Sequence, residues 1–145
     1  MIKILAIIFL TFNIINASEL TLINGNIKIL NLKNISKDKI VNINIFEPYT
    51  KEYTNFQGII LKEFVQTYGL KHNTLILTAL DDYKIEFSKK EIEDKNIILA
   101  FKEKNVYLAP DTKGPLRIIY KDYKKDKNAI YLTKWIWMIV KAEFK

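Results

Sequence analysis

The stretch Gly114-Pro115-Leu116-Arg117-Ile118-Ile119-Tyr120, followed further along by Lys134-Trp135, decides the fold. Pro115 fixes one backbone angle, so Gly-Pro predicts a sharp, rigid turn. The apolar residues after the turn predict a strand over residues 116–120, with Arg117 near its start. A guanidinium held at a strand end is well placed to bind a phosphate or carboxylate through two hydrogen bonds, and Lys134 can supply a second cation.

The same two residues have a simpler interpretation. An arginine after a turn commonly forms a surface ion pair, and a lysine before a tryptophan is commonly solvated beside a core anchor. Residue types alone leave both interpretations of Arg117 and Lys134 open.

Upstream, alternation of apolar and polar residues predicts mostly strands. Asn24-Gly25 predicts a tight hairpin turn, and residues 58–68 predict a helix that Gly69 closes in the left-handed conformation. Ser88 and Glu91 have the spacing of a capping box, which predicts a short helix from Ser88. Strands are expected at residues 20–23, 27–30, 40–45, 74–79, 83–87, 97–101, 106–108 and 140–144. The prediction is one α+β domain, mostly β, over residues 18–145.

Residues 1–17 have the pattern of a signal peptide. Lys3 precedes an apolar run over residues 4–12, and Ala17 is a small residue at a suitable cleavage point. The run is short for a membrane span, so cleavage after Ala17 and export to a periplasm are expected. The alternative is an uncleaved anchor, which would be the protein's one contact with a membrane.

Composition bounds the function. The chain has 145 residues, of which 49% are hydrophobic and 27% charged, as in globular proteins. The net charge is +7, but the lysines are scattered and acidic residues dilute the one dense basic run at residues 121–127, so nucleic-acid binding is not expected. With no cysteine and one histidine, disulfides and zinc-thiolate sites are excluded and a histidine-rich metal site is not expected. We expect no catalytic and no metal-ligating residue, and we expect His72 to be a solvated loop residue.

The order of the motifs resembles the oxidoreductase molybdopterin-binding domain family, which has the sulfite-oxidase-like fold. The resemblance covers about residue 20 to the end, and it implies a mixed sheet arrangement with a cofactor cleft. In that family an arginine and a lysine at matching positions contact the cofactor, which implies this role for Arg117 and Lys134. Tyr83 matches a position that is commonly aromatic, and it either lines the cleft or packs on the sheet. The matching segments are residues 56–61, 79–83 and 99–100, Gly-Pro-Leu-Arg and Lys-Trp.

Catalytic members of the family bind molybdenum through a cysteine thiolate, which this chain lacks, and the matching segment is shortened to residues 46–51. The expectation is an exported, non-catalytic, molybdopterin-binding-like domain that holds an anionic ligand or a molybdopterin-type cofactor at Arg117 and Lys134. Two alternatives remain open. One is a molybdenum-dependent oxidoreductase, or its subunit, with an unusual metal ligand. The other is a scaffold that binds a membrane sensor or an envelope protein.

Overall fold

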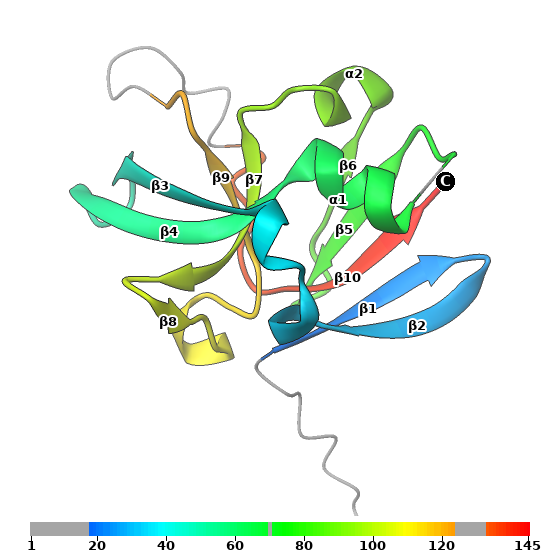
Figure 1. The fold of residues 1–145 in the computed structure, drawn as a ribbon, viewed down its shortest axis with the longest axis horizontal. Coiled ribbons are helices and arrows are strands. Elements are labelled where there is room, and N and C mark those ends of the chain that lie inside the picture. The colour runs from blue at the N-terminus through cyan, green and yellow to red at the C-terminus, as the bar shows by residue number, and fades with distance from the viewer. Residues whose placement is uncertain (1–17, 70, 124–132) are drawn as a thin grey trace, which may run out of the picture.

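Two β-sheets, with short helices against them, make up the computed structural model, which describes residues 18–69, 71–123 and 133–145 (Figure 1). The signal peptide predicted for residues 1–17 lies outside the described residues. Among the described helices, none is long and apolar enough to cross a membrane.

The first sheet has the strand order β2-β1-β10-β5-β6. β1 and β10 are parallel, and the other neighbouring pairs are antiparallel. The last strand in the sequence therefore lies at the centre of this sheet, between two hairpins. Its strands are β1 (Glu19–Asn24), β2 (Asn26–Asn31), β5 (Leu75–Ala79), β6 (Lys84–Phe87) and β10 (Ile139–Phe144).

The second sheet is built around β7, which pairs with β4 along one edge. Two strands share the other edge of β7: β9 pairs with the first half of β7, and β8 pairs with its end. β3 pairs with the outer edge of β4 over eight residues. The strands are β3 (Ile40–Glu47), β4 (Glu52–Ile60), β7 (Ile97–Glu103), β8 (Val106–Tyr107) and β9 (Arg117–Tyr120).

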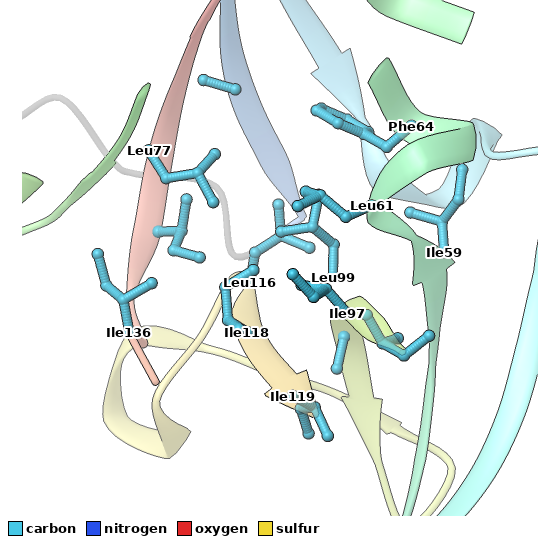
Figure 2. Close-up of a cluster of buried hydrophobic side chains, with 14 of the residues drawn as sticks. Ile59, Leu61, Phe64, Leu77, Ile97, Leu99, Leu116, Ile118, Ile119 and Ile136 are labelled. Atoms are coloured by element: carbon cyan, nitrogen blue, oxygen red, sulfur yellow. The ribbon is translucent and has the colours of Figure 1, made fainter. Parts of the chain in front are cut away.

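The two sheets are joined where β9 meets the segment that leads into β10. Leu116 and Ile139 form an isolated antiparallel bridge, and the Ile118 N–H donates to the Ile136 carbonyl at 2.8 Å. The side chains around this junction are aliphatic and buried, as Figure 2 shows for Leu77, Leu116 and Ile118 among others. One hydrophobic core therefore extends through both sheets.

The helices are short. α1 (Leu61–Tyr68) buries Leu61, Phe64 and Val65, and α2 (Lys89–Ile92) begins with the predicted capping box of Ser88 and Glu91. The prediction that the first helix begins at residue 58 is wrong, because Gly58 to Ile60 pair with β7 as the end of β4. Three 3₁₀ turns complete the fold: η1 (Leu32–Asn34), η2 (Lys37–Lys39) and η3 (Pro110–Thr112).

Gly69 follows α1 for a reason other than the one predicted. Its φ is −100°, so it is not left-handed. A Cβ at this position would lie 2.3 Å from Cδ1 of Phe144, so glycine is needed for close packing. Gly58 is similar, since a Cβ there would lie 2.3 Å from the Leu99 carbonyl oxygen on the neighbouring strand.

The fold class follows the prediction in outline, with one mostly β domain that contains short helices. The predicted strands are all present, with ends shifted by a few residues. β4 is the exception, because no strand is predicted over residues 52–57.

Candidate functional site

Arg117 lies on β9 with only 1% of its surface exposed. Its Nη2 donates to Oε1 of Glu47 at 2.6 Å, and its Nη1 lies 3.6 Å from Oε2 of Glu103. The guanidinium carbon lies 5.2 Å from the ring centroid of Phe56. The Nε–H is buried and has no hydrogen-bond partner among the described residues. The predicted anion-binding arginine is thus enclosed in the protein and faces a carboxylate of its own chain.

Glu47, at the end of β3, is the main partner of Arg117, and its side chain is also fully buried. Its Oε2 accepts from the backbone N–H groups of Tyr49 at 2.9 Å and Thr50 at 2.5 Å. Burial alone would raise the pKa of Glu47, but the hydrogen bond from Thr50 and the positive charge of Arg117 together hold that pKa below its ordinary value. The ionised carboxylate therefore neutralises Arg117 and fixes the turn that carries Tyr49.

Lys134 lies in a different setting. Its Nζ donates to the carboxylate of Glu91 and, at 2.9 Å, to the carbonyl of Glu86. It also lies 5.2 Å from the ring centroid of Phe87. Since Glu91 belongs to the capping box of α2, Lys134 fastens its own segment to the start of that helix.

The structure does not bring Arg117 and Lys134 together. Arg117 bonds to the ends of β3 and β7, whereas Lys134 bonds to β6 and α2, and the two share no bonding partner among the described residues. Joint binding of an anion by these residues stays a prediction, and each cation already has a carboxylate partner.

A second feature is a cavity of about 260 Å³ with aromatic walls, which we call the aromatic cavity. Four aromatic residues line it, and Asp81 is the one charged side chain among its described lining residues. The aromatic residues are Tyr49, Tyr83, Trp135 and Trp137. The Tyr49 and Trp137 ring centroids are 4.7 Å apart, edge to face at 80°. Partial burial, together with the negative charge of Glu47, raises the pKa of Tyr49, so its phenol is neutral at ordinary pH.

Backbone hydrogen bonds fasten the loops around the aromatic cavity. The Met138 N–H donates to the Lys113 carbonyl at 3.0 Å, and the Leu80 N–H donates to the Met138 carbonyl at 2.9 Å. Lys113 and Met138 both have positive φ, at 67° and 54°, a backbone conformation that residues other than glycine adopt at some cost in free energy. The Lys113 ammonium lies 5.3 Å from the Trp137 ring centroid and 5.8 Å from that of Tyr49.

Only part of this cavity is predictable from the sequence. Tyr83 is predicted either to line a cleft or to pack on the sheet, and in the structure it is 54% exposed and lines the cavity. Both tryptophans line the cavity, and Trp135 is buried whereas Trp137 is half-buried. The approach of Lys113 to Tyr49 beside the cavity is not predictable from the sequence, because a turn after β3 and a turn before β9 carry no signal that the two meet.

His72 is also placed differently from the prediction. It was expected to be solvated, but it is half-buried and its Nε2 lies 2.7 Å from Oδ1 of Asn24. It therefore ties the loop after α1 to the β1–β2 hairpin.

Comparison with known proteins gives a fold likeness. No family model matches the chain, and no curated protein matches it. Among solved structures, the chain is similar to the sulfane dehydrogenase SoxCD from Paracoccus pantotrophus, at 10% identity and a TM-score of 0.62. The likeness covers 89% of this chain and 39% of that one, so this chain spans about two fifths of the matched chain. At this identity the likeness is one of fold, and it is distant.

The molybdopterin-type cofactor that the resemblance implies does not fit the residues present. A cofactor phosphate needs cations that no carboxylate of the protein already neutralises, but Arg117 and Lys134 are each paired with a glutamate. The sequence holds no cysteine thiolate, and no group of three metal-ligating side chains occurs among residues 18–69, 71–123 and 133–145.

Proposed function

We propose that this chain is an exported, non-catalytic binding domain with the sulfite-oxidase-like fold. The likeness to a sulfane dehydrogenase supports the fold, and the buried Glu47–Arg117 pair is the observation that carries the non-catalytic part. In the resembled family the matching arginine contacts the cofactor. Here a carboxylate of the same chain lies against it, so the place for an external anion is filled from within.

The pattern of residues 1–17 supports export. Expression of the full chain in a Gram-negative host, followed by cell fractionation and intact mass measurement, is expected to give a periplasmic protein that begins at Ser18. A cytoplasmic protein of full mass would contradict this part of the proposal.

The non-catalytic part is tested by what the protein carries. We expect the chain, purified from a host that makes molybdenum cofactor, to contain far less than one molybdenum per chain by plasma mass spectrometry. The fluorescence of oxidised pterin is expected to be equally low. Stoichiometric molybdenum would overturn the proposal and favour the oxidoreductase alternative.

A matched pair of variants sharpens this test. Glu47→Gln removes the charge that neutralises Arg117, and Glu52→Gln removes a charge from an exposed position on β4. If the internal carboxylate is what closes the site to anions, only Glu47→Gln gains retention of phosphate, measured by ³¹P NMR. Gain in both variants or in neither would contradict the role given to Glu47.

The scaffold alternative is also consistent with the buried Glu47–Arg117 pair, but in it the domain binds a protein instead of a small molecule. A domain whose charged site is filled internally can still present an exposed surface to an envelope partner. Crosslinking in intact cells distinguishes the two cases, because a scaffold gives a defined protein adduct and a small-molecule binder does not.

A further inference from the structure

We propose that the aromatic cavity binds a small organic cation of the quaternary ammonium type. Tyr49, Tyr83 and Trp137 line it, and the faces of such rings attract a cation through their quadrupole. This inference deepens the proposed function, on which it rests, by naming the class of ligand.

The charge of the lining fits a cation. Asp81 is exposed, and its one hydrogen bond is accepted by Oδ1 from the Tyr83 N–H at 3.2 Å. It forms no ion pair with a described residue, in contrast to Glu47 and Glu91. A carboxylate and four aromatic side chains in the lining of one cavity offer a cation both negative charge and aromatic surface.

Lys113 shows that these rings already hold a cation. Its ammonium lies 5.3 Å from the Trp137 ring centroid and 5.8 Å from that of Tyr49, yet Lys113 is not among the residues that line the cavity. The side chain therefore lies beside the cavity as a cation of the protein's own, and its charge opposes a second cation nearby.

The size of the cavity limits the ligand. At about 260 Å³ it is smaller than the usual range for drug-sized ligands, roughly 300–1,000 Å³. The buried Glu47 carboxylate holds the backbone of the turn that carries Tyr49, so this part of the cavity wall is in place before a ligand arrives. A compact cation such as choline suits this cavity better than a long one.

Choline chloride is the probe for the test, and its neutral isostere 3,3-dimethyl-1-butanol is the matched control. Titration of the intact protein, followed by tryptophan fluorescence and by ligand-observed NMR, is expected to show binding of choline at least about 10-fold tighter than that of the isostere. Equal affinity for the two compounds, or no binding of choline, would overturn the proposal.

Adjacent acids provide a matched pair of variants. Asp81→Asn is expected to weaken choline binding about 3- to 10-fold, whereas Asp82→Asn, which alters a residue outside the cavity lining, leaves it unchanged. Asparagine tolerates the positive φ of 65° at position 82, so the control variant folds normally. Equal losses in both variants would show that general surface charge attracts the probe and would overturn the site.

Two further variants separate binding from structure. Tyr83→Leu, at an exposed ring, is expected to weaken choline binding about 3- to 30-fold with an unchanged melting temperature, and Tyr53→Leu on β4 serves as its control.

Lys113→Met removes the competing cation and is expected to tighten choline binding. Unchanged or weaker binding in Lys113→Met would contradict the competition. Because molybdenum content is measured separately, failure of choline binding leaves the non-catalytic proposal standing, and molybdenum in the protein leaves the cation site to be judged by these titrations.

Discussion

At the scale of single residues, the main feature of the site is the buried ion pair between Glu47 and Arg117. A buried ion pair adds little net stability over an apolar pair of the same size, but removal of one partner leaves an uncompensated charge. We expect Glu47→Ala to lower the free energy of unfolding by about 3–5 kcal/mol, measured by urea denaturation.

The matching control is the double variant Glu47→Leu with Arg117→Met, which removes both charges. It is expected to recover most of the lost stability, because no unpaired charge then remains buried. A double variant as unstable as Glu47→Ala would show that the pair contributes through something other than charge balance.

The pH dependence of stability follows from the lowered pKa of Glu47. A carboxyl group whose pKa is lower in the folded state contributes stability above its unfolded pKa, about 4.3, and loses that contribution as the pH falls through the folded value. The difference in unfolding free energy between the wild type and Glu47→Gln is therefore expected to be constant above about pH 5 and to shrink in acid. Denaturation series from pH 7 to pH 2 measure it, and a difference that grows in acid would contradict this assignment.

The sequence points to Arg117 but not to its partner. Gly-Pro before an apolar strand marks the position as special, and the structure places the arginine where the strand begins. Glu47 lies 70 residues earlier, at the end of β3, so no local feature of the sequence indicates that the two residues pair. The same reason applies to Tyr49, Lys113 and Trp137, which lie in three separate connecting segments.

At the scale of elements, β4 depends on a glycine. Gly58 lies at an irregularity in the pairing of β4 with β7, and an added Cβ would lie 2.3 Å from the Leu99 carbonyl oxygen. Because that atom is backbone, it cannot move as a side chain would. We expect Gly58→Ala to cost about 1–3 kcal/mol of stability, measured by thermal or urea unfolding.

Gly25 provides the contrast for that measurement. It has a φ of 68°, and a Cβ there would meet nothing within 4 Å. Gly25→Asn is expected to change stability little, because asparagine tolerates the left-handed conformation and the space is open. If Gly58→Ala were as harmless as Gly25→Asn, the close approach of β4 to β7 would be wrong.

The capping box of α2 is a second prediction at this scale. The Ser88 side chain accepts from the Glu91 N–H, and the Glu91 carboxylate accepts from the Ser88 N–H at 2.9 Å. Ser88→Ala is expected to cost about 1 kcal/mol of unfolding free energy. The neighbouring exposed Lys89→Ala is the control, and a loss as large in that variant would contradict a role for the cap.

Elements were predictable where a local signal exists. A few consecutive residues are enough to predict the Asn-Gly hairpin, the alternating strand β3 and the capping box. All three are present in the structure. β4 is not predicted because its apolar and polar residues do not alternate cleanly. Its last residues, Gly58 to Ile60, also precede an amphipathic helix, and the helical spacing of apolar residues extends back into them. Only pairing with β3 and β7, on both sides, makes this segment a strand.

At the scale of the whole molecule, the junction of β9 with β10 ties the two sheets into one unit. The core runs through both sheets and includes Trp135, which packs near Tyr120 and Tyr123. We therefore expect a single cooperative unfolding transition. Far-ultraviolet circular dichroism and near-ultraviolet circular dichroism of the aromatic side chains are expected to give the same midpoint, and separate midpoints would show that the sheets unfold independently.

The arrangement of β10 has a consequence for how the protein is made. Its residues, Ile139 to Phe144, lie between the β1–β2 hairpin and the β5–β6 hairpin, which do not pair with each other. Until residues 139–144 have left the ribosome or the translocation channel, a nascent chain therefore carries two separate hairpins. Truncation before Ile139 would leave both hairpins with open edges, so we expect such products to aggregate or to be degraded rather than to accumulate as shortened, folded protein.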